Sequence, residues 1–147
     1  MTLAADTRLV PDHAETNRPR AARTNAQQLG DGAEDLVAGS LAEAGWSIVA
    51  RNVRVRRAEI DLIAIDPGPP VTIVFVEVRW RRRRDFGLAD ETIDVRKRGR
   101  LHRAAWEWLA ERTNERAATL PVRFDLIVVE PGRGTGERRM RHHRASI

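Results

Sequence analysis

Two short β-branched runs, residues 58–65 and 71–79, constrain the fold of this chain more than any other stretch. The segment between them, Asp66-Pro67-Gly68-Pro69-Pro70, consists of turn-forming residues, so the two runs predict a β-hairpin. Side chains alternate faces along a strand, and in an antiparallel hairpin this alternation brings Asp61 opposite Glu77. Directly opposed residues have Cβ atoms about 4.5–5.5 Å apart. The hairpin therefore predicts two carboxylates side by side at the open end of an apolar surface.

The acid pair Asp61 and Glu77 has two interpretations. Opposed like charges destabilise a sheet, and ionised carboxylates are seldom buried without a partner. A divalent cation resolves the conflict, because Mg²⁺ binds one or two carboxylates and completes its coordination with water and phosphate oxygens. The alternative is a pair of solvated carboxylates matched to nearby arginines. Both acids interrupt apolar runs and neither lies in a loop, which favours the metal site.

Composition sets the outer limits of the fold and its surroundings. A chain of 147 residues is long enough for one domain with a modest core. The absence of cysteine excludes disulfides and thiolate zinc sites. We find no apolar run that could span a bilayer and no signal-peptide stretch at the N-terminus, so we expect a cytoplasmic protein with no membrane contact.

The pattern of the chain divides it into three parts. Residues 1–24 mix small, polar and charged residues without periodicity and are expected to form a disordered tail. Residues 25–130 carry the periodic segments of one domain. Residues 131–147 begin with glycines and continue with arginines, and we expect a basic, flexible tail in which the adjacent His142 and His143 are solvated.

The domain itself predicts an α/β fold. Helical spacing of apolar residues and turn signals predict, in chain order, a helix at 25–44, a strand at 46–55, the hairpin, a helix at 94–112 and a strand at 121–130. The last strand is apolar on both faces towards its end and should be internal. This order predicts a mixed sheet with helices packed on it.

Positive charge is concentrated in arginine runs at 51–57, 79–84 and 96–103, although the formal net charge of the chain is only +5. Trp80 and Phe86 flank the middle run, a mixture of charge and aromatic rings typical of surfaces that hold single-stranded or distorted nucleic acid. Solvated faces are the alternative. The residues expected to bind nucleic acid are Arg81, Arg82, Arg83, Arg84, Arg96, Arg98, Arg100 and Arg103.

Two ionisable residues stand on the apolar stripes of the predicted helices. Glu34 lies beside the stripe that includes Val37. Lys97 is four and eleven residues before Leu101 and Trp108, so it points inward with them, and it is the only lysine among 26 basic residues. Such a lysine indicates that an ammonium is required at this position. The alternatives are a carboxylate favoured by the helix dipole and a lysine that extends past the stripe to water.

Several of these residues form an ordered set. It comprises Gly30-x-x-x-Glu34-x-x-x-Ala38, Gly45-Trp46, Arg51-Asn52, Glu59-Ile60-Asp61-Leu62-Ile63, Phe75-Val76-Glu77-Val78-Arg79, Phe86-Gly87, Lys97 and Arg123-Phe124-Asp125. Together they resemble the YraN family, an uncharacterised bacterial group that is similar to Holliday-junction resolvases of the restriction-endonuclease-like superfamily. The resemblance covers about residues 25–130 and implies an αβββαβ core with a mixed central sheet flanked by helices.

The resemblance also implies a phosphodiesterase that depends on Mg²⁺ or Mn²⁺. Carried over by position, Asp61 and Glu77 are the metal ligands, Glu34 is the helical acid that completes the site, and Arg79 takes the lysine position of a Glu-x-Lys signature. Ala58 replaces the usual glycine before the Glu-Ile-Asp triplet.

The arginine in the signature changes the expected chemistry. Arginine stays protonated and stabilises phosphate charge, but it cannot act as a general base. We therefore expect Lys97 to reach from its helix towards Asp61 and Glu77 and to supply the ammonium that the strand lacks.

Two functions from different classes follow. The first is a structure-selective endonuclease for branched or recombining DNA, expected to be a homodimer because paired cuts need two sites. The second is a catalytically degenerate nucleic-acid-binding module that assists other DNA-processing proteins. RNA is a weaker third candidate, because the chain lacks the aromatic strand signature of RNA-binding domains.

Overall fold

The computed structural model describes residues 25–81, 93–112 and 119–147. These ranges contain α1 (Asn25–Glu43), β1 (Ser47–Val55), β2 (Ala58–Asp66), β3 (Thr72–Trp80), α2 (Val95–Arg112), β4 (Val122–Pro131) and β5 (Arg138–His143). The expected boundaries of all elements before β5 agree with the observed ones to within one residue. The expected tail at 1–24 and the residues Arg82, Arg83, Arg84, Phe86 and Gly87 lie outside the described ranges. Neither described helix is long and apolar enough to cross a membrane.

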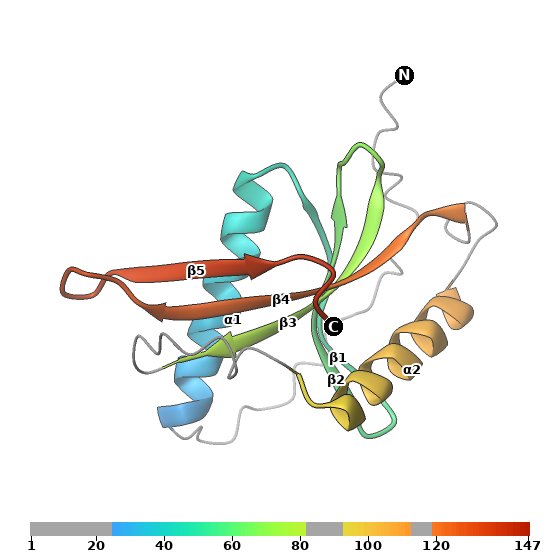
Figure 1. The fold of residues 1–147 in the computed structure, drawn as a ribbon, viewed down its shortest axis with the longest axis horizontal. Helices are drawn as coiled ribbons and strands as arrows, with labels where there is room; N and C mark the ends of the chain where they lie inside the picture. Colours follow the sequence, from blue (N-terminus) through green and yellow to red (C-terminus); the bar gives the residue numbers. More distant parts are fainter. Residues whose placement is uncertain (1–24, 82–92, 113–118) are drawn as a thin grey trace, which may run out of the picture.

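The strands form one mixed sheet with the order β1-β2-β3-β4-β5. Only β3 and β4 are parallel, joined by the crossover through α2, and the other neighbours are antiparallel. The two helices cover opposite faces of the sheet (Figure 1). The predicted α/β fold with a mixed sheet is therefore confirmed, and β4 is internal as expected.

Alternation along β3 divides the core in two. Val74 and Val76 pack on the α1 side, whereas Ile73 and Phe75 pack on the α2 side. Continuing the same alternation, Glu77 and Arg79 belong to the α2 side. The strand that carries the signature acid therefore directs it towards the second helix.

The expected flexible tail at 131–147 is wrong, because residues 138–143 form the edge strand β5. This strand pairs with β4 from Leu126–His143 to Pro131–Arg138. Its sequence contains one apolar residue, Met140, which packs against the α1-side core. The strand satisfies the backbone groups of β4 that would otherwise form an edge, and its arginines protect the new edge from further pairing.

Asp125 anchors this last segment to the sheet. Its carboxylate is fully buried and accepts hydrogen bonds from Arg123 Nε and Nη2 at 2.8 and 2.9 Å. His142 Nε2 lies 2.8 Å from Asp125 Oδ2, and the Ala145 N–H donates to Oδ1 at 3.0 Å. Burial alone would raise the pKa of Asp125, but these hydrogen bonds outweigh it and lower the pKa below its usual value. His142 is therefore part of a buried network, contrary to the expected solvated histidine.

We expect Asp125→Ala to lower the free energy of unfolding by roughly 3 kcal/mol or more, because it removes one partner of a buried ion pair. Urea denaturation at pH 7 measures this. Asp35→Ala is the control, since its ion pair with Arg51 is exposed and should contribute less than about 1 kcal/mol. Because its pKa is lowered, Asp125 adds to the free energy of unfolding above about pH 4, and this stabilisation is lost on acidification. Equal effects of the two substitutions would contradict the anchoring role.

Candidate functional site

Asp61 and Glu77 lie where β2 and β3 separate. The two strands pair from Asp66–Thr72 to Leu62–Val76, and the acids are the next residue on each strand. There the Val78 N–H donates to Asp61 Oδ2 at 2.8 Å. A side-chain oxygen thus accepts from the β3 backbone just beyond the last backbone pair. The two acids lie next to each other at this fork, in the register that the hairpin predicted.

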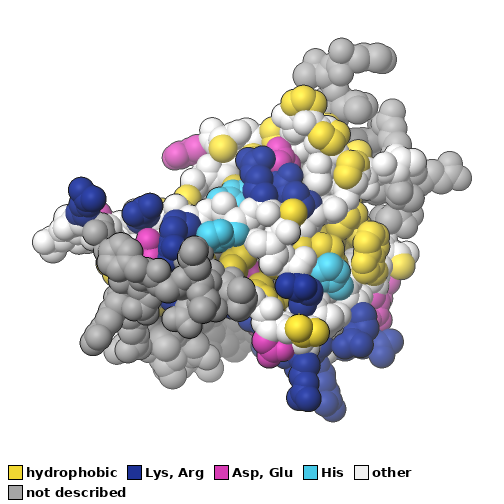
Figure 2. Space-filling model, in the orientation of Figure 1, with side chains coloured by type: hydrophobic (Ala, Val, Ile, Leu, Met, Phe, Trp, Pro, Cys, Tyr) yellow, Lys and Arg dark blue, Asp and Glu magenta, His cyan; other side chains and the backbone are white. Residues whose placement is uncertain are grey.

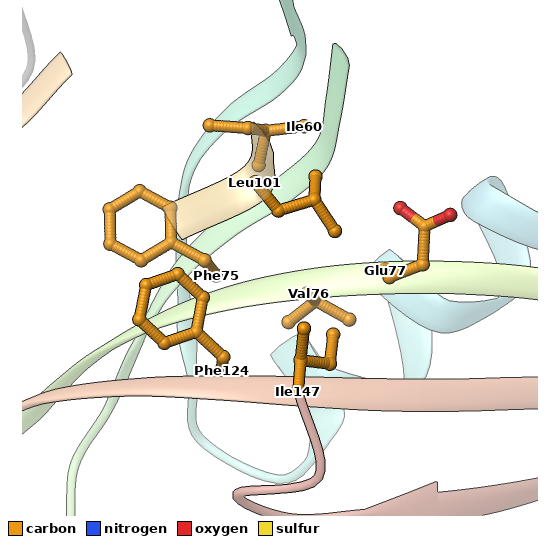
Figure 3. Close-up of a pocket in the computed structure, with 7 residues that line it drawn as sticks. All are labelled: Ile60, Phe75, Val76, Glu77, Leu101, Phe124 and Ile147. Atoms are coloured by element: carbon orange, nitrogen blue, oxygen red, sulfur yellow. The ribbon is translucent and has the colours of Figure 1, made fainter. Parts of the chain in front are cut away.

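Glu77 lies between an apolar cavity and a cation. Its side chain is 9% exposed and forms part of the wall of a cavity of about 10 Å³ that also involves Phe75, Leu101 and Phe124 (Figure 3). On its polar side, Oε1 forms an ion pair with Lys97 Nζ. Lys97 therefore reaches from the start of α2 to the strand, where its helical position placed it. Its side chain remains 42% exposed, so the ammonium is accessible from solvent.

The carboxyl group of Asp61 has an unusual proton affinity. Burial, followed by the charge of Glu77, raises the pKa of Asp61 to about 8, and the charge of Glu34 adds to this effect. The Val78 N–H opposes the shift, because it favours the ionised carboxylate. A carboxyl group in these surroundings gains strongly from a nearby cation, which favours its ionised form.

Glu34 approaches Asp61 from α1, on the other side of the sheet. Burial raises the pKa of Glu34, and interactions with Asp61, Asn52 and Arg51 oppose the shift. Its Oε2 atom is buried and has no hydrogen-bond partner among the residues that the structure describes. The three acids that the sequence singled out are thus neighbours, with Asp61 between the other two.

These side chains are compatible with a hard divalent cation in one respect. Asp61 and Glu77 provide the one or two carboxylates that Mg²⁺ or Mn²⁺ typically takes from a protein, and the buried Oε2 of Glu34 is an unused oxygen donor beside them. In the described part of the chain, however, no three acidic or histidine side chains form an arrangement that could hold a metal ion by themselves. Direct ligation by Glu34 therefore stays a prediction.

A pocket of about 330 Å³ opens over the acid pair. Asp61, Glu77 and Lys97 line it together with Arg57, Ala58, Glu59, Arg100 and Leu101. Arg57 belongs to the turn between β1 and β2, and Arg100 belongs to α2. The pocket therefore lies between the β1–β2 hairpin and α2. Sequence reasoning did not select Arg57 or Glu59. Arg57 belongs to the arginine run at 51–57. The alternation of side chains along β1 and β2, however, does not predict which helix packs across the turn between these strands.

The other predicted residues lie around this pocket. Arg79 is half-buried on β3, two residues after Glu77. Arg81 follows β3 directly, and its N–H donates to the Val129 carbonyl at 2.8 Å. Arg96, Arg98, Arg100 and Arg103 are all exposed on α2. Of these four only Arg100 is among the residues that line the pocket.

Comparison with known proteins gives one consistent match. Residues 33–129 match the family described as Uncharacterised protein family UPF0102. A UPF0102 protein of Symbiobacterium thermophilum is 43% identical over 107 residues, which cover 73% of this chain and 86% of the relative. UPF0102 proteins of Deinococcus radiodurans and Pseudomonas paraeruginosa are each 38% identical, covering 85% and 80% of this chain and 94% and 90% of the relatives. These matches confirm the membership in the uncharacterised YraN-like family that the residues indicated.

We expect Asp61→Asn to stabilise the protein. The folded pKa of Asp61 lies above that of an unfolded aspartate, so the folded state binds more protons, and the free energy of unfolding falls as pH rises from about 4 to about 8. An asparagine keeps an oxygen that can accept the hydrogen bond from the Val78 N–H. It removes the cost of ionising a buried carboxyl group. A tenfold change in proton affinity is worth about 1.4 kcal/mol, so the gain at pH 8 should exceed about 1 kcal/mol.

Chemical denaturation at pH 5 and pH 8 measures this gain, which should be larger at pH 8. Glu59→Gln is the matched control, because Glu59 lines the same pocket but is exposed. A destabilised Asp61→Asn protein, or an equal gain in the control, would contradict the burial of a strained carboxyl group.

Proposed function

The chain belongs to the uncharacterised protein family UPF0102, and we propose that it is a divalent-metal-dependent endonuclease that hydrolyses phosphodiester bonds in branched or recombining DNA. One observation carries the proposal: two adjacent carboxylates, Asp61 and Glu77, and the Lys97 ammonium line one pocket that arginines also line. Carboxylates that can bind a cation, beside cations that can bind phosphate, are the arrangement that phosphoryl transfer requires.

Each residue has a distinct part in this proposal. Mg²⁺ or Mn²⁺ would be held by Asp61 and Glu77, with Glu34 behind Asp61, and when bound it would act as a Lewis acid towards the phosphate. The Val78 N–H fixes the orientation of Asp61 Oδ2. Lys97 holds Glu77 in place and presents a cation to the negative charge that develops on the phosphate.

The positions of Lys97 and Arg79 support the idea that the ammonium has moved from strand to helix. An arginine cannot act as a general base, so in this proposal Arg79 would bind phosphate and stabilise its charge. Lys97 contacts the signature acid Glu77 itself. Arg79 belongs to the face of the sheet that α2 covers, and Lys97 reaches this face from α2. The helix can therefore supply the ammonium that the signature normally places on the strand.

The substrate and assembly follow from the resemblance and from chemistry. The paired cuts that resolve a four-way junction need two active sites acting together, so we propose a homodimer. The second candidate function is a binding module with a degenerate site that assists other DNA-processing proteins. Arg79 in place of the signature lysine is the observation that favours it.

Incubation with labelled four-way junction, flap and duplex DNA tests the activity. Cleavage should require Mg²⁺ or Mn²⁺, and Glu77→Gln should reduce it by about 100-fold or more, the typical effect of losing one group that stabilises the transition state. Glu59→Gln is the control, since it removes the same charge from another part of the pocket. Cleavage that persists in chelator or in Glu77→Gln would contradict the proposed site. Binding without cleavage in the wild type would favour the accessory module.

Lys97→Met should lower cleavage by orders of magnitude and leave DNA affinity nearly unchanged, because the Lys97 ammonium is already paired with Glu77 and contributes little to binding. Thermal melting checks that the variant folds, and Arg98→Met serves as the control on the exposed side of α2. If Arg79→Lys raises activity while Lys97→Met does not change it, the ammonium does not act from the helix.

A further inference from the structure

We propose that Arg57 and Arg100 form a phosphate clamp that holds the backbone of one nucleic-acid strand across the Asp61–Glu77 pair. This inference rests on the proposed function, since it assigns the phosphodiester substrate to the same pocket. It names a residue, Arg57, that the sequence did not select, and it separates Arg100 from the other arginines of α2.

The clamp is built from two elements that meet only in the folded chain. Arg57 is the second residue of the two-residue turn between β1 and β2, and Arg100 lies in the second turn of α2. Both side chains line the 330 Å³ pocket that contains the acid pair. Positive side chains gather at the lower edge of the face in Figure 2, where the β1–β2 turn and the start of α2 lie in Figure 1. A strand that follows this edge passes over the two carboxylates.

Ion pairing distinguishes the clamp residues from their neighbours. Arg56 is bonded through Nε to both oxygens of Glu107 at 3.1 Å, and Lys97 is bonded to Glu77. Neither Arg57 nor Arg100 has an ion-pair partner within the described residues. Of the three cations that line the pocket, these two are therefore available to an anion.

Each of the two arginines lies next to a local departure from the usual structural rules, which supports a role in binding. A two-residue hairpin turn prefers glycine or asparagine where φ is positive, yet Arg56, with φ 55°, occupies that position and Arg57 follows it. The first turn of α2 carries Arg96, Lys97 and Arg98 at the positive end of the helix dipole and has no acid, and Arg100 follows in the second turn. Strain and misplaced charge of this kind concentrate at functional sites.

Guanidinium groups suit the task. Each presents several N–H donors in a planar fork that matches two oxygens of one phosphate. No aromatic side chain is among the residues that line the pocket, so contact is expected with the sugar–phosphate backbone and not with stacked bases. The clamp would hold the phosphates on either side of the one that reacts.

Fluorescence anisotropy with a labelled single-stranded oligonucleotide, in chelator and over a series of salt concentrations, tests the clamp. Arg57→Gln and Arg100→Gln should each weaken binding by about 5- to 10-fold and lower the slope of log affinity against log salt by about 0.7. Arg56→Gln and Arg112→Gln remove the same charge from the same two elements, at residues that are ion-paired and lie outside the pocket. They should change affinity by less than about twofold.

Equal weakening by all four variants would overturn the clamp, because it would show a general effect of surface charge, and so would unchanged binding in both clamp variants. Melting curves confirm that the variants fold. The metal site is tested separately by Mn²⁺ titration of the wild type and Glu77→Gln. If Mn²⁺ does not bind but the two clamp variants still lose affinity, the clamp stands and the nuclease proposal fails. If cleavage occurs and the clamp variants bind normally, the clamp alone fails.

Discussion

The two carboxylates at the fork between β2 and β3 are the constraint on which the rest of the site depends. Asp61 and Glu77 repel each other in a partly buried setting, at the point where the pairing of β2 with β3 ends. The surrounding groups compensate locally: the Val78 N–H binds one acid and the Lys97 ammonium the other. A single salt bridge does not neutralise the pair, so the fork costs stability, and the divalent ion of the proposed function would relieve this repulsion.

The parts of this arrangement that obey a simple period could be predicted from the sequence. Alternation with a period of two, together with a clear turn, was enough to set Asp61 opposite Glu77. The helical period was enough to direct Lys97 towards the sheet, because Leu101 and Trp108 fix which face of α2 is buried. Both predictions concern which side chains share a face. The function of those side chains is a further step that remains a proposal.

The features that the sequence did not reveal depend on contacts between distant segments. β5 has one apolar residue, Met140, and no alternation, so its pairing follows from the open edge of β4 and from the buried Asp125 rather than from its own pattern. Arg57 is similar, because its position over the acid pair depends on how α2 crosses the hairpin turn. Register along one element is a local property, whereas the crossing of two elements is not.

Three departures from local rules lie in this pocket or next to it. Two acids interrupt apolar strands, cations occupy the positive end of α2, and an arginine adopts positive φ in the turn that precedes β2. Each of these departures lowers the stability of the folded protein. Each could be removed, without changing the fold, by one substitution to a residue that the local structure prefers. On the neighbouring strand β4, Asp125 and Arg123 obey the rule that buried charges are paired. The contrast between a fully satisfied network and a strained one, in the same sheet, supports the proposed site at the fork by an argument that does not use the resemblance.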